Sequence, residues 1–138
     1  MPLKPPPRTK MEYEKVKTDD WTQGIIEDVQ HDEKRDTGFK DDDTGENKIV
    51  DSVRFKFKLD GYSYPHYSRW MTLSYHEKSN LFKKYITNLV EGAAQDLDFD
   101  LERLKGFPVK VMWQDNGDFQ NVEMVRPLVK KIDPTLPF

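Results

Sequence analysis

IVDSVRFKFKL, residues 49–59, carries the clearest periodic pattern in this 138-residue chain. Over its second half, four apolar residues alternate with three cations, in the order Val53, Arg54, Phe55, Lys56, Phe57, Lys58 and Leu59. A period of two is typical of a β-strand that buries one face and exposes the other. An Asp60-Gly61 turn signal follows directly. The sequence therefore predicts a strand with a cationic outer face that leads into a hairpin.

Two further strands are predicted around this one. Residues 21–29 form the strand before it, and its Gly24 predicts a bend or the close approach of another backbone. Residues 67–75 form the returning strand. Its predicted inward residues are Met71 and Leu73, and its predicted outward residues are Trp70, Thr72 and Ser74. A bulge near Arg69, which would turn Trp70 inward, is the alternative for this strand.

The next segment predicts a helix. Ser79 is a suitable N-cap, and apolar residues recur at three-to-four spacing from there to Val90. Gly92 then ends the helix. A short second helix is expected around residues 101–104.

A second hairpin is predicted near the end of the chain. Residues 108–114 form one strand, and its Trp113 shares the apolar face and is expected in the core. Asn116-Gly117 is a tight turn signal. Residues 119–126 form the last strand, which Pro127 stops.

Composition divides the chain into one domain and two flexible ends. Four prolines and three cations among residues 1–10 predict a flexible, Pro-rich basic arm over residues 1–18. The domain is expected to occupy residues 19–128, and residues 129–138 to form a flexible C-terminal tail. Between the first two strands, residues 30–48 predict a long exposed loop. It belongs to an acidic stretch, residues 27–48, in which nine acidic residues outnumber four basic ones.

The composition also excludes several classes of protein. The chain has no cysteine, so disulfides, thiol nucleophiles and thiolate zinc sites are excluded, and a cytoplasmic location is expected. No apolar run approaches the roughly 20 residues that a membrane-spanning helix needs, so no membrane partner is expected. The net charge of −3 gives no simple polycation argument for nucleic-acid binding.

The candidate metal ligands do not match a known spacing. The histidines, which show no short spacing, are His31, His66 and His76. Asp41–Asp43 are weakly similar to a calcium loop, but Ser52 stands at the twelfth position, where a glutamate is needed. A nuclease cluster is the less favoured interpretation of the polar connector that contains Asp96, Asp98, Asp100 and Glu102. We therefore expect no metal, no cofactor and no enzymatic activity.

The predicted order of elements is five strands with a helix between the third and fourth. In this order, residues 21–127 resemble the OB-fold single-stranded nucleic-acid-binding proteins, including small phage and bacterial ones. Residues 106–111 (GFPVKV), Asn121-Val122 and Arg126-Pro127 add to the resemblance. It implies a mainly β, five-stranded Greek-key barrel. It also implies a DNA-binding role in replication or recombination, without catalysis, in the cytoplasm of a bacterial or phage-infected cell.

The resemblance implies a binding site on the outer face of the sheet. Cations there would track phosphates and aromatic rings would stack on bases. The candidate cations are Arg54, Lys56, Lys58 and Lys110, and the candidate aromatic residues are Tyr62, Tyr64, Tyr67, Trp70 and Phe119. Two alternatives compete with this interpretation: the cations could be the ordinary polar side of a strand, and the tyrosines could pack over the open end of the barrel.

Single-stranded DNA with little sequence preference is the expected partner, with RNA as an open alternative. The runner-up is an OB-fold module that binds a protein partner. The chain ends with Pro137-Phe138, similar to the tip with which bacterial single-stranded DNA-binding proteins recruit replication proteins, but the acidic half of that tip is missing. The sequence leaves the oligomeric state open.

Overall fold

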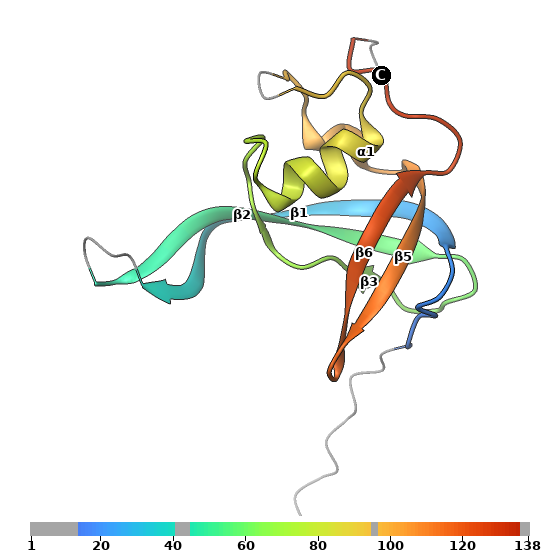
Figure 1. Ribbon diagram of the computed structural model, residues 1–138, viewed down its shortest axis with the longest axis horizontal. Coiled ribbons are helices and arrows are strands. Elements are labelled where there is room, and N and C mark those ends of the chain that lie inside the picture. Colours follow the sequence, from blue (N-terminus) through green and yellow to red (C-terminus); the bar gives the residue numbers. More distant parts are fainter. Residues whose placement is uncertain (1–13, 41–44, 95–96, 136–138) are drawn as a thin grey trace, which may run out of the picture.

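The computed structural model describes residues 14–40, 45–94 and 97–135. These residues form one antiparallel sheet in the order β3-β2-β1-β5-β6, with β4 also paired to β2 (Figure 1). The strands are β1 (Thr22–Lys40), β2 (Asn47–Leu59), β3 (His66–Tyr67), β4 (Met71–Thr72), β5 (Pro108–Asn116) and β6 (Phe119–Pro127). Among the described residues β6 pairs only with β5, so the sheet does not close. The mainly β prediction is confirmed, whereas the closed barrel stays a prediction.

β1 and β2 form a long hairpin that extends well beyond the body of the molecule (Figure 1). The prediction of a loop over residues 30–48 is wrong, because strand pairing continues through Asp36 opposite Ile49 to Lys40 opposite Asn47. A two-stranded ribbon outside the core has no buried face, so it needs no apolar period and its sequence looks like a loop. Asp41–Asp43 lie outside the described residues.

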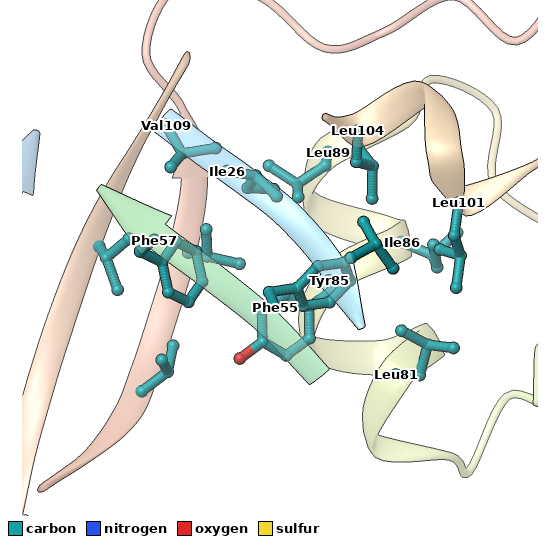
Figure 2. Packing of buried hydrophobic residues seen from close by; sticks show 14 of the residues in the cluster. Ile26, Phe55, Phe57, Leu81, Tyr85, Ile86, Leu89, Leu101, Leu104 and Val109 are labelled. Atoms are coloured by element: carbon teal, nitrogen blue, oxygen red, sulfur yellow. The ribbon is translucent and has the colours of Figure 1, made fainter. Parts of the chain in front are cut away.

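The alternation predicted for β2 is confirmed. Its buried side chains are Val53, Phe55, Phe57 and Leu59. Figure 2 shows Phe55 against Tyr85 of the helical layer, with ring centroids 4.7 Å apart. Trp113 of β5 is 1% exposed and therefore in the core, as predicted. The close approach at Gly24 is also confirmed, because a Cβ there would lie 2.3 Å from the Lys58 carbonyl oxygen.

The third predicted strand is broken into β3 and β4. Between them, Ser68 donates its backbone N–H to the Phe55 carbonyl oxygen (2.9 Å), and its hydroxyl accepts the Phe55 N–H (2.8 Å). A side-chain oxygen thus takes the place of a strand carbonyl. Met71 is buried as predicted, whereas Leu73, just beyond the end of β4, lies on the inner side but outside the core, since it is 38% exposed and lines a cleft with Val53.

One short helical layer covers one side of the sheet (Figure 1). It includes the π-helical turn η1 (Phe82–Ile86) and the α-helical turn α1 (Thr87–Leu89). The predicted N-cap is confirmed, since the Ser79 hydroxyl accepts the Phe82 N–H (3.1 Å). The predicted turn near residues 101–104 is the 3₁₀ helix η2 (Leu101–Leu104).

Residues 14–17 lie between the β2–β3 connection and β6, on the side where the sheet is open. Val16 is 1% exposed, and its backbone exchanges two hydrogen bonds with the Gln120 amide (2.9 and 2.7 Å). The Glu14 carbonyl oxygen lies 2.5 Å from His66 Nε2. We call residues 14–17 the N-terminal strap. These contacts differ from the flexible arm predicted over residues 1–18, because the structure buries Val16, the one β-branched residue of the strap.

The start of the predicted C-terminal tail is held against the helical layer. Ile132 donates its N–H to the Leu89 carbonyl and accepts from the Glu91 N–H (both 2.8 Å). The Arg103 guanidinium donates to the Pro134 carbonyl oxygen (3.1 Å). These contacts differ from the flexible tail expected over residues 129–138, because the half-buried Ile132 packs against the core. Residues 136–138 lie outside the described part of the chain.

Candidate nucleic-acid interface

Arg54 is the first of three cations, Arg54, Lys56 and Lys58, that form a cationic stripe on the outer face of β2. Its guanidinium carbon lies 4.3 Å from the ring centroid of Tyr67 and 4.8 Å from that of Trp70. Its Nε donates to the side-chain oxygen of Gln30, its neighbour on β1 (2.6 Å). The side chain is therefore held in one position between two aromatic rings and an amide.

Arg35 brings a second guanidinium to the same place. Its guanidinium carbon lies 4.9 Å from the Trp70 ring centroid. Arg35 is not among the residues predicted for the site, because the sequence predicts a loop there and cations outnumbered by acidic residues give no signal. We call Arg35, Arg54, Tyr67 and Trp70 the cation–aromatic platform.

The break in the third strand builds this platform. In a regular strand Tyr67 and Trp70, three positions apart, would point to opposite faces of the sheet. The irregular backbone around Ser68 instead brings both rings within 5 Å of the Arg54 guanidinium carbon. Tyr67 is 36% exposed and Trp70 is half-buried. Each cation–π contact at such an exposed site contributes roughly 0.5–1 kcal/mol, so the platform is ordered before any ligand arrives.

The two lysines of the stripe differ in their surroundings. Lys56 Nζ lies 3.2 Å from Glu27 Oε1, and the hydrogen bond and charge of this carboxylate raise the pKa of Lys56. Lys58 is exposed and, among the described residues, belongs to no ion pair. Lys58 is therefore the lysine of this stripe that is open to a phosphate.

Lys110 extends the cationic surface across the sheet. It lies on β5 opposite Gln23 of β1 and Arg126 of β6, and its Nζ is 4.9 Å from the ring centroid of Trp21. Arg126, which the sequence analysis left out of the site, is exposed beside it. Two regions of the outer face therefore combine an indole ring with cations: the platform on β2 and the Trp21–Lys110 pair between β1 and β5.

The other three predicted aromatic residues lie around the N-terminal strap. Tyr62 is half-buried, edge-on to His66 (5.4 Å), and its hydroxyl oxygen accepts the Lys17 N–H (3.4 Å). The Tyr64 N–H donates to the Glu14 carboxylate (2.7 Å). Phe119 begins β6 and is 75% exposed, next to the Gln120 that binds the strap. The structure therefore brings Arg54, Tyr67 and Trp70 together, whereas Tyr62, Tyr64 and Phe119 lie apart from them, around the strap.

An apolar cleft of 420 Å³ lies on the opposite, inner side of the β1–β2 hairpin. Val29, Leu73 and Phe99 contribute apolar walls, and Asp100 and Glu102 contribute an acidic rim. Tyr75 lines it as well and donates its hydroxyl to the Phe99 carbonyl oxygen (2.7 Å). Burial, together with the nearby Asp100 charge, raises the pKa of Tyr75 to about 12.

The described residues contain no group of three or more His, Asp or Glu side chains that could hold a metal ion. No helix in this part of the chain is long and apolar enough to cross a membrane. In comparisons with protein-family models, with curated proteins and with solved structures, nothing matches this chain.

Proposed function

We propose that the outer face of the sheet binds single-stranded nucleic acid, with single-stranded DNA as the main ligand. The observation that carries this proposal is the cation–aromatic platform, in which two guanidinium groups pack on two aromatic rings, with Tyr67 36% exposed and the other three side chains partly exposed. Sequence-tolerant binding of single strands needs these two components: flat rings that stack on bases and cations that follow the backbone.

The connectivity of the sheet supports the proposed fold class. β1 pairs with both β2 and β5, and the helical layer lies in sequence between β4 and β5. An OB-fold has this order, with its last strand returning toward its third. Here the N-terminal strap occupies the space between β3 and β6. We therefore infer a Greek-key barrel of the OB type that is completed by the strap rather than by direct strand pairing.

The mechanism proposed is binding without catalysis. Bases stack on the exposed side of the platform, and Lys58, Lys110 and Arg126 neutralise phosphates along the path from β2 to β6. Stacking on an aromatic ring does not depend on which base is present, so little sequence preference is expected. Such a protein would protect single strands during replication or recombination.

Fluorescence anisotropy titrations with oligo-dT, single-stranded RNA and duplex DNA test the proposal. We expect Trp70→Ala to lower the affinity for oligo-dT by about 1–3 kcal/mol. Tyr64→Ala, which removes an exposed ring outside the platform, is the matched comparison and should have little effect. Melting temperatures of both variants control for unfolding. Equal binding by the wild type and a folded Trp70→Ala variant would contradict the proposed site.

A second function is favoured by one observation, the apolar cleft of 420 Å³ with its acidic rim. Its volume falls within the range of pockets that hold small molecules, and its apolar walls equally suit the apolar side chains that form the core of a protein–protein interface. Salt separates the two functions. Each neutralised phosphate of a single strand contributes about −0.7 to the slope of log affinity against log salt. A partner held in an apolar cleft would give a much shallower slope.

A further inference from the structure

A small pocket lies at the open side of the sheet, between β4, the helical layer and β6. Tyr85 and Val122 contribute its apolar walls. Its volume is 70 Å³, far below the roughly 300–1,000 Å³ of pockets that hold whole small molecules. It therefore suits a single compact group rather than a base or a nucleoside.

The polar groups of this pocket are hydrogen-bond donors of positive or neutral charge. Arg69 comes from the break between β3 and β4, and Asn80 and Lys84 come from the helical segment. No carboxylate is among the described residues that line the pocket. Arg69 and Lys84 form no ion pair with any described residue, in contrast to Lys56 and its partner Glu27. A compact anion with several acceptor oxygens matches this set of donors.

Trp70 joins this pocket to the cation–aromatic platform. Trp70 is one of the residues that line the pocket, and its ring centroid lies 4.8 Å from the Arg54 guanidinium carbon. An anion held by Arg69 and Lys84 would therefore lie beside whatever stacks on the platform. In a nucleic-acid strand, each base is attached to a sugar whose 5′ and 3′ oxygens carry backbone phosphates, so a phosphate lies one sugar away from every stacked base.

We propose that the pocket formed by Arg69, Asn80 and Lys84 binds one backbone phosphate of the strand whose bases stack on the platform. This inference rests on the proposed function. It also gives the strand a path: from the outer face of β2, over Trp70, to the gap between β4 and β6. The Arg69 guanidinium and the Lys84 ammonium hold the phosphate charge, and the Asn80 amide donates to one of its oxygens.

The experiment compares Lys84→Gln with Lys83→Gln. Lys83 is the exposed neighbour of Lys84 and does not line the pocket, so both variants lose the same charge from the same turn. The probe is oligo-dT, titrated by anisotropy over a series of NaCl concentrations. We expect Lys84→Gln to reduce the magnitude of the log–log salt slope by about 0.7, equivalent to about a fivefold loss of affinity at 0.1 M salt. Lys83→Gln should leave the slope unchanged.

A second probe, an abasic oligomer of equal length, keeps the phosphates and lacks the bases. Lys84→Gln should weaken binding of both oligomers by the same factor, whereas Trp70→Ala should weaken only oligo-dT. If the wild-type protein binds neither oligomer, both the proposed function and the phosphate pocket are overturned. If it binds oligo-dT and the two lysine variants share one salt slope, the pocket alone is overturned and the platform stands.

Discussion

Ser68 shows how one side chain shapes the candidate site. By accepting the buried Phe55 N–H through its hydroxyl, it satisfies a strand donor without a strand carbonyl. The backbone is then free to leave the regular pattern, and Tyr67 and Trp70 reach the same side of the sheet. The aromatic part of the platform thus depends on a small polar residue that itself is 5% exposed.

Replacing Ser68 by Ala should destabilise the protein. The buried Phe55 N–H would lose its acceptor, and an unsatisfied buried donor costs about 1–3 kcal/mol. Ser63→Ala is the matched control, because Ser63 is exposed and uses its backbone N–H, not its hydroxyl, to bind Glu14. Urea unfolding of both variants measures the effect. A Ser68→Ala variant as stable as Ser63→Ala would mean that another acceptor replaces the hydroxyl.

The raised pKa of Tyr75 predicts that the folded chain loses stability at high pH. Its pKa is about 12 in the folded chain, because of burial and the Asp100 charge, against about 10 in an unfolded chain. Between these values the folded chain keeps a proton that the unfolded chain has released, so the free energy of unfolding falls as the pH rises from about 10 to about 12. Burial also raises the pKa of Tyr85, which adds to the fall.

The variant Tyr75→Phe should flatten this dependence. It removes one of the two phenols whose ionisation favours unfolding, while the hydrogen bond to the Phe99 carbonyl is lost at every pH. Chemical denaturation at several pH values between 9 and 12 measures the slope. The same slope in Tyr75→Phe as in the wild type would show that Tyr75 ionises alike in both states.

At the scale of elements, the sequence predicts the strands and helical turns whose apolar side chains pack in the core. The period of two in residues 53–59 and the Ser79 cap each reflect a local rule that the structure obeys. The second predicted hairpin forms as well, but its turn residues are Gly117 and Asp118, because Asn116 is still paired with Phe119. The outer end of the β1–β2 hairpin follows no such rule. Its strands pair through backbone hydrogen bonds without a buried apolar face, so the mostly charged residues 30–36 carry no apolar signal. Arg35 was missed for this reason.

The candidate site was predictable only in part for a related reason. Arg54 and Trp70 stand out in the sequence because a period of two and an indole predicted to face outward can be recognised locally. The contacts of Arg35, Arg69 and Lys84 depend on which elements meet at the break in the third strand. No short-range sequence pattern predicts this break. It forms because the Ser68 hydroxyl accepts the Phe55 N–H, for which a regular strand would supply a backbone carbonyl.

At the scale of the whole molecule, both ends of the chain contribute to one body. The N-terminal strap binds β6, and residues 131–134 bind the helical layer and η2. A domain limited to residues 19–128 would therefore lack the contacts of the N-terminal strap with β6 and those of residues 131–134 with the helical layer and η2.

Deleting residues 129–138 should lower the free energy of unfolding by about 2–4 kcal/mol. The deletion removes several hydrogen bonds, each worth roughly 0.5–1.5 kcal/mol net, and uncovers Val90, which is 0% exposed. Deleting only residues 136–138 is the control and should leave both DNA affinity and these contacts intact. Thermal melting and urea unfolding of the two truncated chains make the comparison. Equal stability would show that residues 131–134 contribute nothing to folding.

The N-terminal strap also sets an order of events during synthesis. Residues 14–17 leave the ribosome before any strand of the sheet, yet the amide that binds Val16 belongs to Gln120, 104 residues later in the chain. Contacts of such sequence separation form late and slow the folding of β-rich domains. Until β6 has emerged, Val16 and the open side of the sheet both stay exposed to the cell. A nascent chain that stalls before Gln120 therefore presents an unfinished β surface, the kind of surface that chaperones bind and that aggregates.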